Sequence, residues 1–226
     1  MILGLDGGPE MLNIQPVGPD TRHANPSMIS MKNQTARTAS ALLLLAAITL
    51  YRLCIGLQTG HLPWLENFAP VAAVALCGGI YLPRRLAFIV PLGALFISDL
   101  FLNRHFHAPL VSAEMISRYL ALAASVAIGF ALRNRARLAT VLPASVLGSF
   151  IFYVLTNTSS WFTSPSYART FSGWLQALTT GLHGYPPTWT FFQATLVSDL
   201  LFTALFVLCM AATAAPAQAE IMNYEV

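Results

Sequence analysis

Long apolar runs, separated by short polar connections, fill most of the chain between residues 39 and 212. They cover residues 39–57, 68–83, 86–103, 114–132, 138–157 and 188–212. Most approach the roughly 20 residues that a helix needs to cross the hydrocarbon of a bilayer. Because backbone polar groups cannot stay unpaired in lipid, each run should be helical. The pattern predicts an all-α fold, a polytopic transmembrane bundle of six helices spanning 39–212.

The two flanks lack this pattern. Residues 1–38 hold Gly, Pro, Asn and scattered charges without sustained periodicity, which indicates a disordered tail, and residues 213–226 should form a second tail. The apolar stretch 41–50 leads to Arg52 and then continues apolar, with no small-residue cleavage site, so it does not read as a signal peptide.

Composition favours the same class of protein. The chain is 56% hydrophobic and only 9% charged, with a mean hydropathy of +0.62, whereas a soluble domain carries about 25% charged residues. No basic cluster is dense enough to suggest nucleic acid binding. Cys54, Cys77 and Cys209 lie inside apolar runs at spacings that fit neither a disulfide framework nor a zinc site, so we expect buried free thiols and no bound metal or cofactor.

Basic residues in the short connections predict the orientation of the bundle. One set of connections carries Arg84 and Arg85, then "RNRAR" at 133–137, and Lys32 and Arg37 precede the first run. The opposite set holds only Arg104 and Arg169. Since short cytoplasmic loops are rich in Lys and Arg, both termini should face the cytoplasm of a bacterial inner membrane.

The outer connections 58–67, 104–113 and 158–187 gather imidazole and aromatic groups, among them His105, Trp64, Trp161 and Tyr167. Trp and Tyr at this level are also ordinary interfacial anchors. Within the last connection, Phe171, Trp174, Leu175, Leu178 and Leu182 recur at helical spacing, which predicts a short amphipathic helix lying in the interface.

Acidic side chains inside the apolar runs raise the question of function. "FISDLF" places Asp99 near the outer end of the third run, and "LVSDLLF" places Asp199 halfway along the sixth. A carboxylate within a span costs a few kcal/mol, at least about 2.5, and usually faces the bundle interior or a wet cavity with a partner. Asp99 should therefore face or organise a ligand site, whereas Asp199 could simply tie helices together. Arg52 should pair with one of these carboxylates.

Further polar groups converge on the outer half. Asn67 opens the second run, Asn157 closes the fifth, and Glu114 and Arg118 share a face of the fourth at i,i+4 spacing. The Ser-Asp dipeptide also recurs in the third run of each half, which hints at a three-plus-three internal repeat, and such repeats place transporter sites at their interface.

Several kinds of chemistry lack their motifs. The sequence has no Gly-rich phosphate loop, no His-Glu pair at metalloprotease spacing and no Gly-x-Ser-x-Gly. "HFH" at 105–107 could touch a metal, although nothing else completes a coordination shell and a solvated loop is the simpler interpretation.

A family resemblance adds to this picture. "ENFAPVAAVALCGGIYLPRRLAFIVPLGALFISDLFLN" (66–103), "FYVLTNTSSWF" (152–162), "YARTFSGWLQA" (167–177) and "TLVSDLLFT" (195–203) resemble an uncharacterised group of bacterial six-helix membrane proteins. That group is similar to the substrate-binding S components of energy-coupling-factor (ECF) transporters. The resemblance implies an outward pocket built from the outer loops, a transmembrane scaffold partner and a pair of ATPase subunits. It also leaves Cys77 open as a ligand to a metal-bearing substrate. Span one, "ASALLLLAAITL", departs from the Ala-x-x-x-Ala docking surface of S components.

The sequence thus favours a non-enzymatic substrate-binding subunit for uptake of a vitamin-like micronutrient or a related small molecule. The expected substrate-binding residues are Asn67, Asp99, Asn157, Trp64, Trp161, Tyr167 and His105, and the expected structural polar residues are Asp199, Arg52, Arg118 and Glu114. Two alternatives stay open: a structural or assembly protein whose polar residues only pack helices, and an integral membrane enzyme using Asp99 and His105 as acid and base.

Overall fold

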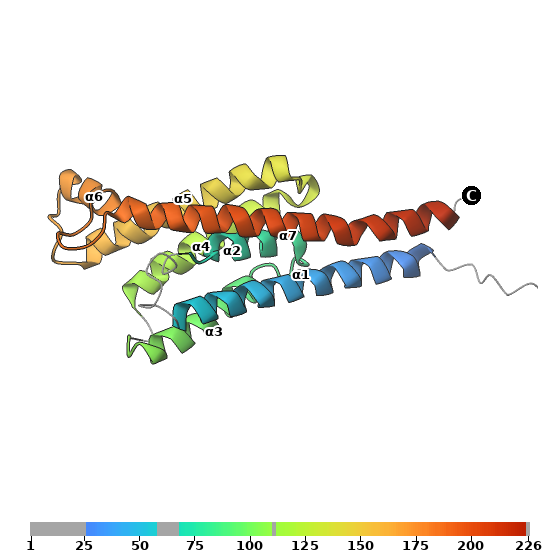
Figure 1. Cartoon of the computed structure of the whole chain (residues 1–226), viewed down its shortest axis with the longest axis horizontal. Coiled ribbons are helices and arrows are strands. Elements are labelled where there is room, and N and C mark those ends of the chain that lie inside the picture. Colours follow the sequence, from blue (N-terminus) through green and yellow to red (C-terminus); the bar gives the residue numbers. More distant parts are fainter. Residues whose placement is uncertain (1–25, 58–67, 110–111, 225–226) are drawn as a thin grey trace, which may run out of the picture.

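The computed structural model describes residues 26–57, 68–109 and 112–224, and within these ranges the protein is helical, with no strand (Figure 1). The α-helices are α1 (Pro26–Leu57), α2 (Val71–Tyr81), α3 (Ile89–His105), α4 (Ala113–Ala131), α5 (Leu138–Thr163), α6 (Phe171–Leu178) and α7 (Thr188–Tyr224). A 3-10 turn, Arg133–Arg135, joins α4 to α5. The all-α fold class is therefore confirmed.

Four helices contain segments that are long and apolar enough to cross a membrane: Gln34–Leu57, Glu114–Ala131, Leu138–Thr163 and Thr188–Thr213. The two other expected spans are shorter. α2 has 11 residues and α3 has 17, or about 16 and 25 Å at 1.5 Å per residue, against a hydrocarbon core of about 30 Å. The helices thus support membrane insertion, while six complete spans are more than the described helices supply.

Helices extend into both flanks, so the disorder expected for residues 1–38 requires correction from Pro26 onward. α1 begins at Pro26, inside the region expected to be disordered, and α7 continues through residue 213 to Tyr224. Proline is well suited to the first helical position, since its missing N–H would have no partner there. An existing helix such as α1 extends at little cost through helix formers such as Ala, Gln and Lys, because only nucleation is expensive. Residues 1–25 lie outside the described residues.

α2 is the central helix of the bundle. Each of its residues from Val71 to Ile80 is buried, because α1, α4, α5 and α7 all pack against it, and Figure 1 shows it between the longer helices. A helix that is apolar on every side belongs in a core. The short second run is therefore an internal helix, surrounded by protein.

Two glycines let α2 and α4 approach backbone to backbone. A Cβ on Gly79 would lie 2.3 Å from the carbonyl oxygen of Val126, and a Cβ on Gly129 would lie 2.2 Å from that of Leu76. Small residues at crossings are the usual means of tight packing between membrane helices. This contact fixes α4, and hence its amino-terminal turn, relative to the start of α2.

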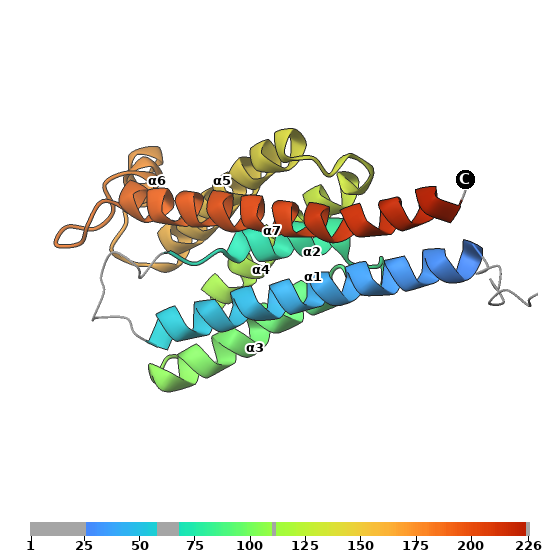
Figure 2. The ribbon, with the colours of Figure 1, turned by 45° about the vertical axis from the view of Figure 1, so that its right-hand side comes forward.

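The two basic turns lie side by side. Arg133 donates through Nε to the carbonyl oxygen of Gly79 at 2.8 Å and through Nη2 to that of Leu82. The guanidinium carbons of Arg133 and Arg84 lie 4.3 and 5.8 Å from the ring centre of Phe130. Burial, and then the charge of Arg84, lower the pKa of Arg133. These turns share one end of the bundle with the start of α1 and the end of α7 (Figures 1 and 2), as the charge pattern predicts.

The predicted short helix in the 158–187 connection is present as α6. Thr170 caps it by accepting from the backbone N–H of Gly173. Phe171 and Leu175 are exposed, whereas Gly173 and Ala177 are buried, so small residues face the bundle and large apolar ones face outward. Trp174 donates to Thr158 Oγ1 at 2.9 Å and joins α6 to the end of α5.

Candidate functional site

A polar cleft of about 320 Å³ opens among five helices, beside the starts of α2 and α4, which are the ends of these helices away from the basic turns. α1 contributes one lining residue, the start of α2 two, the start of α4 three, α5 three and α7 one. They are Arg52, Ala69, Val71, Glu114, Ser117, Arg118, Phe152, Thr156, Ser160 and Thr195. This lining combines charged groups, hydroxyls and a few apolar contacts, so it offers several convergent polar groups to a small polar molecule.

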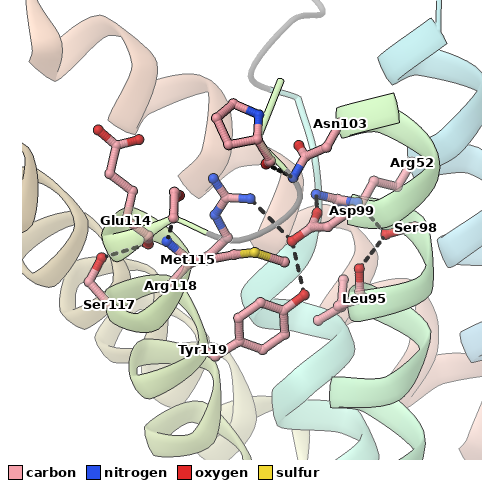
Figure 3. A network of polar contacts seen from close by, with 12 residues as sticks. Arg52, Leu95, Ser98, Asp99, Asn103, Glu114, Met115, Ser117, Arg118 and Tyr119 are labelled. Atoms are coloured by element: carbon pink, nitrogen blue, oxygen red, sulfur yellow. Dashed lines mark hydrogen bonds and ion pairs between the residues drawn. The ribbon is translucent and has the colours of Figure 1, made fainter. Parts of the chain in front are cut away.

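The floor of the cleft rests on an ion-pair network centred on Asp99 (Figure 3). Asp99 Oδ1 accepts from Arg52 Nη2 at 2.5 Å, and Oδ2 accepts from Arg118 Nη1 at 3.1 Å. Tyr119 Oη donates to the same Oδ2 at 2.9 Å. With only 3% of its side chain exposed, Asp99 has both oxygens engaged, so this carboxylate organises three helices around the cleft.

Ser98 extends the network on α3. Its Oγ accepts from Arg52 Nη1 and donates to the backbone carbonyl oxygen of Leu95 at 2.8 Å. Arg52 is thereby held through both terminal nitrogens, as Figure 3 shows. The expectation that Arg52 pairs with one of the two carboxylates, those of Asp99 and Asp199, is confirmed.

Each of the two arginines has N–H donors that make no hydrogen bond within the described residues. Arg52 Nε is buried and has no hydrogen-bond partner among the described residues. Arg118 bonds through Nη1 alone within the described part of the chain, and 32% of its side chain is exposed. Arg118 therefore presents N–H groups that the network around Asp99 does not use, and Arg52 retains one buried N–H without a partner among the described residues.

The second Ser-Asp pair serves a different purpose. Asp199 on α7 is fully buried. Its Oδ1 accepts from the backbone N–H of Ala73 at 2.9 Å, and its Oδ2 accepts from Ser149 Oγ at 2.7 Å. Pro70 precedes α2 without a capping side chain, so Asp199 supplies the acceptor that the first turn of α2 lacks and complements the positive end of the helix dipole. The expectation that Asp199 ties helices together is confirmed.

The other predicted binding residues described in the structure lie outside the cleft. Asn157 Nδ2 donates to the carbonyl oxygen of Tyr153 within its own helix, at 2.8 Å. Trp161 Nε1 donates to the carbonyl oxygen of Ala168 at 2.8 Å, and Tyr167 is half-buried, which raises its pKa. Trp161 thus joins the end of α5 to the segment before α6, and none of the three residues lines the cleft. Trp64 and Asn67 lie outside the described residues.

His105 lies at the end of α3, exposed, with its ring edge-on to Phe106 at 4.9 Å between centres. Among the described residues, no three His, Cys, Asp or Glu side chains come close enough together to hold a metal ion. Cys77 is buried within α2 and does not line the cleft. Neither the histidine nor this cysteine belongs to the cleft.

Several residues that line the cleft were either predicted to be structural or not predicted at all from the sequence. Arg52, Arg118 and Glu114 were expected to be structural, yet all three line the cleft. The hydroxyls of Thr156 and Ser160 were missed, although a signal exists, since Phe152, Thr156 and Ser160 repeat at i,i+4 spacing and share one face of α5.

A second hollow, of about 420 Å³, lies between α3 and α4 and is almost wholly apolar. It is lined by Phe96, Met115, Ile116, Tyr119 and Leu120. These α4 residues occupy the side of the helix opposite Glu114, Ser117 and Arg118, given 100° per residue. Because an apolar groove in a bilayer is satisfied by lipid chains, the polar cleft is the stronger candidate for a specific site.

The chain belongs to a family of unknown function, DUF6580, whose family profile matches residues 32–220. The match includes every residue that lines the cleft. Neither a curated protein nor a solved structure matches the chain.

Proposed function

We propose that the protein is an integral membrane substrate-binding subunit for uptake of a small molecule, and that the cleft beside Arg52 and Arg118 is its substrate site. The observation that carries the proposal is the cleft itself, a polar hollow at the meeting point of five apolar helices. Polar groups in such helices are costly unless they serve packing or a ligand.

The position of α2 supports this proposal. Ala69 and Val71, at the start of this half-length helix, line the cleft. In many transporters, short or interrupted helices end near the middle of the bilayer, and substrates bind at these ends. If the basic turn after α2 lies at the cytoplasmic surface, 11 residues bring its start about halfway across the membrane.

The proposed orientation follows from the two ends of the bundle. Arg84, Arg85, Arg135 and Arg137 are exposed in two adjacent turns, and the positive-inside rule assigns these turns to the cytoplasm. The cleft then opens toward the outer face of a bacterial inner membrane, as uptake requires. Both termini are proposed to be cytoplasmic, with α2 and α3 completing a six-helix arrangement as shorter members. The three-plus-three repeat stays a prediction.

The resemblance to S components of ECF transporters extends the proposal to partners. Such a subunit would bind its substrate alone and depend on a transmembrane scaffold and ATPase subunits for energy, since the sequence contains no phosphate-binding loop of its own. The lipid bilayer is the other proposed partner, through outward apolar side chains such as Leu43, Ile97 and Leu208.

A structural or assembly role is the second candidate, because Asp99 and Asp199 are both spent on holding helices together. It differs from the first in one respect: a purely structural protein does not need the cleft to stay open.

The test is therefore to fill the cleft. Thr156 lines it, whereas Leu155, the preceding residue of α5, is exposed and does not. Thr156→Trp should block the site, and Leu155→Trp is the matched control. Wild type and both variants are purified from the native host in mild detergent, and bound small molecules are detected by native mass spectrometry.

We expect wild type and Leu155→Trp to carry a small molecule that Thr156→Trp lacks, and cells that overproduce wild type to accumulate that compound. Equal small-molecule content in all three folded proteins, including none, would contradict the substrate-binding proposal and favour the structural role.

A further inference from the structure

We infer that the ligand of the cleft carries a carboxylate, which Arg118 binds with help from Arg52. This inference rests on the proposed function and specifies its substrate class. It follows from the charges of the floor, from the donors that the two arginines leave unused, and from the state of the hydroxyls opposite them.

The charges on the floor of the cleft do not balance. Two guanidinium groups, those of Arg52 and Arg118, share the single carboxylate of Asp99. One positive charge is left without a counterion on the floor. Glu114, the remaining charged residue of the lining, is exposed and has no ion pair among the described residues. With Asp99 and Glu114 the site holds two negative and two positive charges, so an anionic ligand is attracted by the unpaired fork of Arg118 and not by a net charge.

The unused donors have the right geometry for a carboxylate. Arg118 spends only Nη1 on Asp99, so its Nε and Nη2, which form one fork of the planar guanidinium, are available to a second carboxylate. Such bidentate pairing is the strongest form of arginine recognition. Arg52 Nε is buried without a partner in the described part of the chain, and an unpaired buried donor costs about 1–3 kcal/mol until an acceptor or water reaches it.

The hydroxyl groups of the cleft indicate which hydrogen-bonding groups the rest of the ligand carries. Ser117 donates its proton to the backbone oxygen of Glu114 at 2.8 Å, and Thr156 donates its proton to that of Phe152 at 2.8 Å. With their protons spent on their own helices, these oxygens present lone pairs to the cleft. The ligand should therefore combine its carboxylate with N–H or O–H donors.

The experiment uses two sets of probes that share a skeleton and differ in charge. Nicotinate, nicotinamide and 3-picolylamine form one set, and benzoate, benzamide and benzylamine the other. Binding to the full-length protein in lipid nanodiscs is measured by calorimetry and by thermal unfolding. Arg118→Gln removes the proposed anion donor, and Arg104→Gln is the matched control, an exposed arginine at the end of α3 that does not line the cleft.

We expect at least one carboxylate to bind ten-fold or more tightly than its amide and its amine. Arg118→Gln should weaken that binding ten-fold or more, and Arg104→Gln should leave it unchanged. If an amide or amine binds best and Thr156→Trp abolishes that binding, the carboxylate inference fails while the substrate-binding proposal stands. Binding of no probe, or equal binding of a carboxylate by wild type and Arg118→Gln, would also overturn the inference, and the cleft-filling experiment would then decide the proposed function by itself.

Discussion

Replacing Asp99 by Asn should destabilise the protein strongly while preserving its shape. The amide keeps the size of the carboxylate, yet it leaves the guanidinium of Arg52, whose side chain is only 11% exposed, without a counterion. Removing one partner of a buried ion pair costs about 3–5 kcal/mol. Arg118, which is 32% exposed, can turn toward solvent and adds little, so we expect a loss of about 3 kcal/mol in the free energy of unfolding.

The measurement is reversible unfolding in mixed micelles, titrated with SDS and followed by circular dichroism. Glu114→Gln is the control, because Glu114 is exposed and has no ion pair among the described residues, so its loss should stay within about 0.5 kcal/mol. Arg52→Gln combined with Asp99→Asn should cost clearly less than the sum of the single changes, since residues in one network are not additive. A single Asp99→Asn variant within about 0.5 kcal/mol of wild type would refute the view that Asp99 holds the bundle together.

Three further outcomes are expected. Ser149→Ala should lower the free energy of unfolding by about 1.5–3 kcal/mol, because it removes a 2.7 Å hydrogen bond to the Asp199 carboxylate; SDS titration checks this, and an unchanged midpoint would contradict it. Gly129→Ala should cost about 2 kcal/mol or more, because the new Cβ meets a backbone oxygen at 2.2 Å, whereas Gly93→Ala, with nothing within 4 Å, should not destabilise the protein. Arg135→Cys, in a variant without the native cysteines, should react with a membrane-impermeant maleimide in inverted vesicles and stay unlabelled in intact cells; the reverse pattern would invert the proposed topology.

The runs of apolar residues located the helices, and the distribution of charged residues predicted which helix ends lie on the same side. The run at 114–132 became α4, Ala113–Ala131, almost residue for residue, because an unbroken apolar stretch can satisfy its backbone only as a helix. The arginines at 84–85 and 133–137 predicted which turns share an end. These properties are local, so the order of residues along the chain is sufficient to read them.

The partners of the polar residues depended on packing. The sequence showed two identical Ser-Asp pairs, one in α3 and one in α7. In the structure, Asp99 pairs with two arginines, whereas Asp199 caps the neighbouring helix α2 by accepting from the backbone N–H of Ala73. No property of the dipeptide distinguishes these roles. They follow from which helix end or side chain lies opposite, and that depends on contacts across 19 to 126 residues of sequence.

By itself, then, the amino-acid sequence determined an apolar helical protein with a basic end and an aromatic, polar end. Only the tertiary structure decided that α2 is a short internal helix, that Thr156 and Ser160 of α5 line the cleft, and that Arg118 pairs with Asp99. A cleft exists only where faces of several helices meet, and its lining is set by crossing points such as Gly79 against Gly129, which no single segment encodes.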